Sequence, residues 1–197
     1  MKRHSMRSFV SASVFAAAAA LLLTPAPAAA QFVPPSAPEA GTWSVSPFVA
    51  TSMGIGDPAP GNSLGLGVAV SYNWTGHLAF EGEFSHLLDV AGDAPEVDWS
   101  ITTFSGNVVY HFDVQRVTPY ATAGLGFERS SYSLPDATVP VFDPSATEFV
   151  FNFGGGVKIP VAERIHVRAD LRRFQALDLA PDFWRLYGGL TFVLNRR

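Results

Sequence analysis

Two carboxylates in the chain have the spacing of an acid/base pair. Glu81 and Glu83 lie two residues apart in "HLAFEGEFS" (77–85). In an extended strand they project from one face, about 7 Å apart at a rise of ~3.3 Å per residue. A carboxylate pair at this separation could hydrolyse a glycosidic bond. We favour the alternative that both are counter-charges for Arg168 and Arg172 in an interior ionic network.

A second candidate for chemistry is the group Ser85, His86 and Asp89, because a hydroxyl beside an imidazole suggests a hydrolase. Consecutive residues of a strand point to opposite faces, so Ser85 and His86 would not meet as nucleophile and base. Metal-ligand spacing is absent from the other histidines considered, His77, His111 and His166. The stretches "GLGF" and "FGGGV" lack the spacing of a phosphate-binding loop. We therefore predict no catalytic site, metal site or cofactor.

Acidic residues gather in four long segments that we interpret as loops, at about 55–63, 88–98, 130–146 and 175–182. None of these segments contains Lys or Arg. Their acidic residues are Asp57, Asp89, Asp93, Glu96, Asp98, Asp136, Asp143, Asp178 and Asp182. The simplest interpretation is a solvated acidic rim. The alternative is a surface that binds divalent cations or a basic partner.

Composition limits the classes of protein to which the chain can belong. Charged residues make up 15% of its 197 residues and aromatic residues 13%, which is unusual for a cytosolic enzyme. The absence of cysteine excludes disulfides, thiolate zinc sites, cysteine nucleophiles and a lipoprotein anchor. Residues 1–30 combine three basic residues, an apolar run and a terminal Ala-Ala-Ala, which predicts a cleavable signal peptide. A Pro-rich tail follows at 31–41.

Removal of the signal peptide would leave 10 basic residues against 17 acidic ones, so the exported chain is acidic. A nucleic-acid partner is not expected for such a chain.

Strand-like alternation of apolar and polar residues dominates positions 42–197. We predict eight strands of about ten to thirteen residues, at 43–54, 64–74, 77–87, 99–112, 117–129, 147–159, 164–174 and 183–194. This length is close to the 9 to 11 residues that a tilted strand needs to cross a bilayer. The connections alternate between long loops and tight turns, which is typical of an up-and-down barrel. The sequence therefore predicts an all-β, eight-stranded antiparallel transmembrane barrel over 42–197.

The two faces of the predicted strands differ in size and in charge. One face carries Phe, Leu, Val, Tyr and Trp, and eight such faces would overfill so narrow an interior, so we place the small-residue face inside. Aromatic residues near the strand ends match two interfacial belts: Trp43, Tyr72, Trp74, Tyr110 and Phe112 by the turns, and Phe84, Phe127 and Trp184 by the loops. The inward face carries charges of both signs: Glu81, Glu83, Glu128, Glu148, Asp170, Lys158, Arg168, Arg172 and Arg185. We expect these charges to pair with one another.

Four stretches carry a resemblance to a known family: "TPYATAGLGFE" (118–128), "NFGGGVKI" (152–159), "IHVRADLRRF" (165–174) and "YGGLTFVL" (187–194). In these stretches the chain resembles the small outer-membrane β-barrel proteins of the OmpA/OmpX-like class. The last stretch also resembles the signal for the barrel-assembly machinery, with Gly189, Phe192 and Leu194 in the required alternation. The chain departs from that signal by continuing Asn195-Arg196-Arg197 instead of ending on an aromatic residue.

The resemblance implies Sec-dependent export, residence in the bacterial outer membrane, and contact with outer-membrane lipid and lipopolysaccharide. Divalent cations at the acidic loops could be shared with lipopolysaccharide. We predict a structural or surface-interaction role, with an interior plugged by the charge network and with no enzyme activity. Three alternatives stay open: a narrow pore, a lipid-modifying outer-membrane enzyme, and a soluble periplasmic lipocalin-like ligand binder.

Overall fold

The computed structural model describes residues 38–54, 63–88, 98–114, 116–133, 145–176 and 183–195. The predicted signal peptide and residues 31–37 of the Pro-rich tail lie outside this part. No helix long and apolar enough to cross a membrane occurs among the described residues.

Eight strands account for almost all of the described chain. They are β1 (Trp43–Gly54), β2 (Ser63–Asn73), β3 (Leu78–Leu88), β4 (Asp98–His111), β5 (Thr118–Ser133), β6 (Ala146–Ala162), β7 (Ile165–Ala176) and β8 (Phe183–Val193). The predicted strands 43–54, 64–74, 77–87, 99–112, 117–129, 147–159, 164–174 and 183–194 are confirmed, and most of their ends are right to within one or two residues.

The largest differences between the predicted and observed strand ends are at the long-loop end of β5 and at the short-turn end of β6. The ladder between β4 and β5 continues to the pair Asp98 and Ser133, so β5 is four residues longer than predicted. Main-chain pairing sets these ends, and side-chain alternation alone does not show how far the pairing continues. At the opposite end of β6 the register with β7 shifts between Pro160 and Ala162, because proline cannot donate to the ladder.

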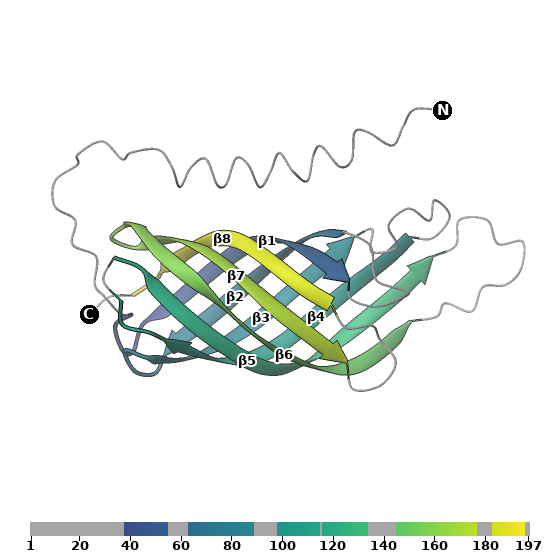
Figure 1. The fold of residues 1–197 in the computed structure, drawn as a ribbon, viewed down its shortest axis with the longest axis horizontal. Helices are drawn as coiled ribbons and strands as arrows, with labels where there is room; N and C mark the ends of the chain where they lie inside the picture. Colours follow the sequence, from purple (N-terminus) through teal and green to yellow (C-terminus); the bar gives the residue numbers. More distant parts are fainter. Residues whose placement is uncertain are drawn as a thin grey trace, which may run out of the picture. The chain divides into compact units, whose positions relative to one another are not determined.

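All eight strands form one closed antiparallel barrel in the order β1 to β8 (Figure 1). β1 closes the ring by pairing with β8, from Ser44 opposite Val193 to Gly54 opposite Phe183. Closure leaves no strand edge unpaired, which a spanning sheet requires in a hydrocarbon environment. The predicted eight-stranded up-and-down fold is therefore confirmed.

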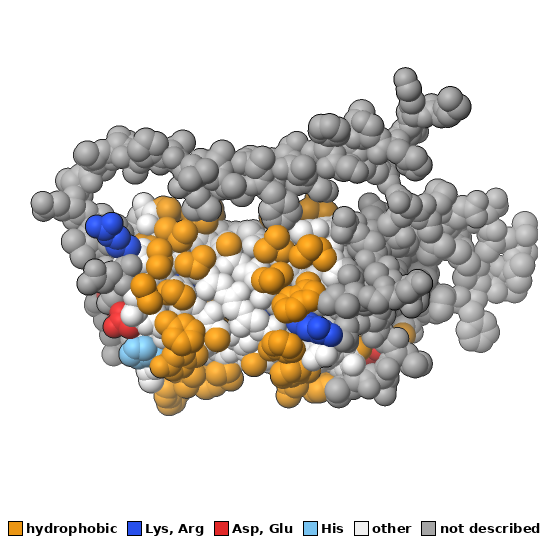
Figure 2. All heavy atoms as spheres, viewed as in Figure 1, with side chains coloured by type: hydrophobic (Ala, Val, Ile, Leu, Met, Phe, Trp, Pro, Cys, Tyr) orange, Lys and Arg blue, Asp and Glu red, His pale blue; other side chains and the backbone are white. Residues whose placement is uncertain are grey.

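On the face of the barrel drawn in Figure 2, large apolar side chains form two bands with paler surface between them. Trp74 of the β2–β3 turn is 61% exposed and Phe104 of β4 is 60% exposed. In water such a surface would be costly, whereas in lipid it is the preferred arrangement. The soluble lipocalin-like alternative needs the opposite orientation, so the outward apolar face argues against it.

The interior also contains several large apolar side chains, which a face of small residues alone would not predict. Phe48, Phe174, Phe183 and Tyr187 belong to a buried apolar cluster together with Leu87, Ile101 and Val150. Phe174 and Phe183 are partners across β7 and β8, and their rings stack with centroids 5.4 Å apart. Glycine makes room for this bulk, because a Cβ on Gly67 would meet the ring of Phe48.

Gly154 and Gly82 form a matched test of this packing. A Cβ on Gly154 would meet the backbone of Leu171 and Arg172, whereas a Cβ on Gly82 would meet nothing within 4 Å. We expect Gly154→Ala to lower the free energy of unfolding by about 1–3 kcal/mol or more, because the backbone cannot yield cheaply. Gly82→Ala should change it by less than about 0.5 kcal/mol. Urea unfolding of the barrel in detergent measures both, and equal stabilities of the two variants would contradict the packing.

Candidate functional site

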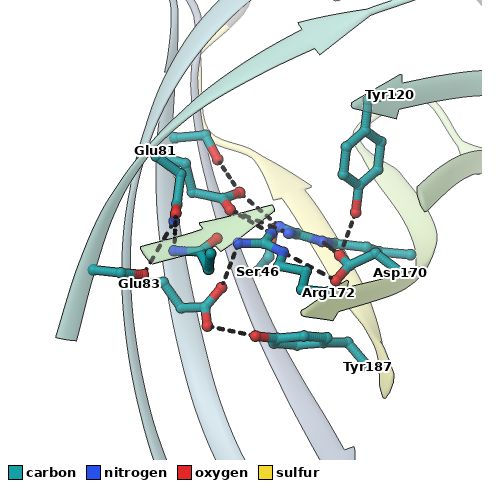
Figure 3. Close-up of polar contacts among 12 residues, drawn as sticks. Ser46, Glu81, Glu83, Tyr120, Asp170, Arg172 and Tyr187 are labelled. Carbon is teal, nitrogen blue, oxygen red and sulfur yellow. Dashed lines mark hydrogen bonds and ion pairs between the residues drawn. The ribbon is translucent and has the colours of Figure 1, made fainter. Parts of the chain in front are cut away.

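The most unusual feature of the interior is an ionic cluster centred on Arg172 of β7. The Arg172 guanidinium lies 2.8 Å from Glu81 Oε1, 3.0 Å from Glu83 Oε2 and 3.3 Å from Asp170 Oδ1 (Figure 3). These residues share the inward face because each is spaced by two along its strand. One arginine therefore joins three carboxylates from β3 and β7.

Arg168, four residues before Arg172 on β7, strengthens the same cluster. Its Nη1 and Nη2 donate to the two oxygens of Glu81 at 2.7 and 3.2 Å, and its Nε donates to Asp170 Oδ2 at 2.7 Å. The fork-like contact with Glu81 is the strong bidentate geometry of arginine and carboxylate. Tyr120 donates from its hydroxyl to the same Asp170 oxygen, and Ser71 donates to Glu81.

Arg185 of β8 links the ionic cluster to the apolar one. Its guanidinium lies 3.8 Å from Glu83 Oε1 and donates to Ser85 Oγ at 2.8 Å and to Thr103 Oγ1 at 3.0 Å. It also packs 4.1 Å from the ring centre of Phe174. Tyr187 completes the coordination of Glu83 by donating from its hydroxyl at 2.9 Å.

Charge in this central cluster is balanced. Three arginines and three carboxylates are all at most 3% exposed: Arg168, Arg172, Arg185, Glu81, Glu83 and Asp170. Isolated charges in such a place would carry a desolvation penalty of several kcal/mol each, so mutual pairing is what makes their burial tolerable. The arrangement holds strands β3, β7 and β8 together across the lumen.

The remaining charges assigned to the interior lie outside this cluster. Glu128 is buried and faces Glu148, which is half-buried, directly across β5 and β6. Lys158 is buried toward the short-turn end, with His111 Nε2 at 3.3 Å. Among the described residues, neither Glu128 nor Lys158 has an opposite charge within 4 Å. The nine predicted charges are thus one six-membered cluster and three residues beyond it.

The geometry disfavours the hydrolase interpretations. Glu81 and Glu83 are both engaged by arginine, as the network interpretation supposes. Ser85 is buried in the interior, whereas His86 is on the outer face, where its Nδ1 lies 2.8 Å from Thr102 Oγ1. The described part of the chain contains no group of three or more His, Asp or Glu that could hold a metal ion.

The other histidines serve packing and hydrogen bonding. His77 stacks on Tyr110, with ring centres 6.1 Å apart, and His111 lies against Tyr120 at 6.0 Å. His166 lies on β7 near the short-turn end.

Most of the acidic loop residues lie outside the described part of the chain: Asp57, Asp89, Asp93, Glu96, Asp136, Asp143, Asp178 and Asp182. Asp98 corrects the sequence interpretation, because it is the first residue of β4 and not part of a loop. Its main chain pairs with Ser133, and this pairing extends the strand beyond the predicted start.

Gly189, Phe192 and Leu194, the residues of the predicted assembly signal, lie where β8 pairs with β1, a junction that we call the seam. Gly189 is opposite Phe48, Phe192 is opposite Val45, and Leu194 donates its backbone N–H to the Trp43 carbonyl at 2.9 Å. Asn195, where the chain departs from the family signal, accepts from Trp43 N at 2.7 Å and donates to the Gly41 carbonyl at 3.3 Å. Both sides of the seam are thus tied together at the short-turn end.

Sequence reasoning did not assign a role in the network to several polar partners. Tyr120 and Tyr187 bind the central carboxylates, and Asn152 donates to Asn107 Oδ1 at 2.9 Å. Ser46 and Thr191 share a hydrogen bond of 2.8 Å across β1 and β8. The signal was present in the alternation, because each of these residues is on the inward face, but alternation does not say which partner each one reaches.

Removal of Arg172 tests the cluster. Arg172→Met would leave three buried carboxylates with only two arginines, so we expect the free energy of unfolding to fall by about 3–5 kcal/mol. Arg164→Met in the exposed β6–β7 turn is the matched control and should stay within about 0.5 kcal/mol of the parent. Both are measured by urea unfolding in detergent. A parent-like stability of Arg172→Met would show that the cluster does not hold the barrel together.

Comparisons with known proteins agree with this geometry. The family model of the outer membrane protein beta-barrel domain matches residues 15–192. No curated protein matches. Among solved structures, the neisserial surface protein A has a TM-score of 0.64 at 18% identity, covering 77% of this chain and 97% of that one.

Two further structures share the fold at similarly low identity. The N-terminal barrel domain of Pseudomonas aeruginosa OprF has a TM-score of 0.55 at 19% identity, covering 77% of this chain and 97% of that one. Ail, the attachment invasion locus protein of Yersinia pestis, has a TM-score of 0.55 at 18% identity, covering 78% of this chain and 99% of that one. The family match spans most of the sequence, and the chain belongs to the outer membrane protein β-barrel family.

Proposed function

We propose that this chain is a closed, non-catalytic barrel with a structural or surface-interaction role in the bacterial outer membrane. The observation that supports this best is the balanced cluster of three arginines and three carboxylates across the lumen. Export by the Sec pathway, through the signal predicted at 1–30, belongs to the same proposal.

The cluster supports a barrel that does not conduct ions freely. An ion or a water column passing through the lumen would have to separate pairs such as Arg172 with Glu83 at 3.0 Å. Breaking a buried pair costs about 3–5 kcal/mol, so an open state would be sparsely populated. Toward the long loops, the stacked Phe174 and Phe183 add an apolar layer around Arg185. The narrow-pore alternative is therefore less well supported.

Among the described residues, no nucleophile and base meet as the lipid-modifying alternative requires. Ser85 donates nothing to a base and accepts from Arg185, while His86 is on the other side of the strand. Acid/base chemistry by Glu81 is disfavoured in the same way, because Arg168 engages both of its oxygens. No cofactor is part of the proposed role.

Interaction with the surroundings is assigned to the long loops, which members of this architecture present to the cell exterior. Residues 55–62, 89–97, 134–145 and 177–182, which connect the strands in sequence at this end, carry acidic side chains and no basic ones. Hard oxygen ligands suit Ca²⁺ and Mg²⁺, so we propose that the loops bind divalent cations shared with lipopolysaccharide, or a basic partner. The barrel wall contacts outer-membrane lipid, and the barrel-assembly machinery would read the terminal strand.

A planar-bilayer recording tests the closed lumen. The purified, folded protein should show no large and stable single-channel steps, because every path meets the ionic cluster. A porin recorded in the same bilayers is the positive control. Large, reproducible steps from the parent protein would overturn the closed-barrel proposal.

Calcium titration tests the loops separately. Millimolar Ca²⁺ should raise the melting temperature of the folded barrel or reduce loop mobility, whereas Na⁺ at equal ionic strength should not. A variant with Asp136→Asn and Asp143→Asn should respond less. Asp113→Asn, in the exposed β4–β5 turn, is the matched control and should respond like the parent. The absence of any calcium effect on the parent would remove cations from the proposal.

A further inference from the structure

A polar recess lies at the short-turn end of the barrel, away from the ionic cluster. Its wall is formed by the start of the described chain and by the ends of six strands or turns: Pro38, Glu39, Thr42, Ser44, Asn73, Thr118, Lys158, His166, Thr191 and Val193. Hydroxyl and amide side chains form half of this lining. The proposed surface role of the long loops makes no use of it, because it is at the opposite end of the strands.

Lys158 is the unusual member of the lining. Its side chain is only 6% exposed, yet no carboxylate of the described chain lies within 4 Å of its Nζ. Its recorded contacts are the ring nitrogen of His111 at 3.3 Å and the face of the Tyr120 ring at 5.3 Å. A lysine ammonium carries three N–H donors, so these contacts leave donor capacity unused. A buried cation without a counter-charge is energetically costly.

The nearest charged neighbour of Lys158 is a second cation. Arg168 is its direct partner across β6 and β7, and both cations lie over the ring of Tyr120. The carboxylates Glu81 and Asp170 are already bound to arginines at 2.7 Å. Like charges opposite each other in a sheet repel unless a third group compensates them. Among the described residues, no carboxylate forms an ion pair with Lys158 itself.

We propose that this recess binds a small oxyanion, with the Lys158 ammonium as the charged donor. Thr118 and Thr191 line the same space. Thr118 supplies a neutral hydroxyl donor, and Thr191 supplies a second one when Ser46 is the donor in the hydrogen bond that they share. Glu39 is the acidic residue of the lining, so it opposes an anion and limits its affinity. The ligand class is a phosphate or carboxylate group reaching the barrel from the periplasmic side. It is either a free ion or the end group of a larger envelope molecule.

Inorganic phosphate and acetate are the two probes for this site, used with the full folded chain in detergent at constant ionic strength. Phosphate should shift the backbone amide resonances of Asn73, Thr118 and Thr191 in a saturable way and raise the melting temperature. Acetate at equal concentration reports whether a planar carboxylate suffices. Saturable binding of either probe supports the site, and the stronger probe indicates the end group to search for on larger molecules.

Two variants change the expected affinity in opposite directions. Lys158→Met should weaken binding at least about tenfold, because a charge-assisted hydrogen bond is lost. In anion-free buffer it should melt no lower than the parent, since it removes an uncompensated charge. Glu39→Gln should bind more tightly than the parent. Arg164→Gln removes an exposed cation from the same rim and should bind like the parent.

Three results would overturn the proposal. The first is that neither probe gives a saturable response. The second is that Lys158→Met binds with the same affinity as the parent. The third is that Arg164→Gln abolishes the response as fully as Lys158→Met does, which would indicate general charge attraction. The melting temperatures of Lys158→Met and the parent in anion-free buffer show whether the variant is folded. A Lys158→Met protein that melts far below the parent without anions would mean that Lys158 is compensated within the barrel.

Discussion

Closure of the sheet is the constraint on which the rest of this structure depends. In hydrocarbon every backbone N–H and C=O must find a partner within the protein. One side of β1 pairs with β2, and the other side can pair only with β8. Once eight strands close, the lumen is narrow enough that side chains fill it. The inward residues are then forced into contact, whatever their chemistry. Their pairing is a consequence of closure as much as a cause of it.

The interior resolves this crowding in layers. At the centre, arginines and carboxylates from β3, β7 and β8 neutralise one another. On the long-loop side, Phe174 and Phe183 flank Arg185, so a charged group and an apolar layer share one space. On the short-turn side half of the lining residues carry hydroxyl or amide side chains. This order places the strongest electrostatic contacts where water is most completely excluded, and such contacts are strongest there.

The sequence predicted the barrel well because its signals repeat in every strand. Alternation of period two and the alternation of long and short connections are properties of the whole chain, so a few large inward residues such as Phe48 do not disturb them. The partners inside the barrel were less predictable. Arg172 and Lys158 are both inward basic residues of "GGGVKI" or "IHVRADLRRF", yet one meets three carboxylates and the other none. Which residues meet depends on the stagger between strands far apart in sequence, and alternation carries no information about stagger. The extension of β4 to Asp98 was missed for a related reason, since main-chain pairing continues where the side-chain pattern stops.

The seam between β1 and β8 also has a consequence for how the molecule forms. It joins residues about as far apart in the chain as the barrel allows, with Trp43 and Asn195 separated by 152 positions. All other neighbouring strands are consecutive and can pair locally as hairpins. Every partly assembled form therefore has two open edges, at its first and last strands, and each edge is a template for pairing with another chain. The side chain of Asn195 forms hydrogen bonds with both Trp43 and Gly41. These bonds join the two edges at the short-turn end of the barrel, where β1 begins and β8 ends. The step that completes the molecule is thus also the step that removes its tendency to aggregate.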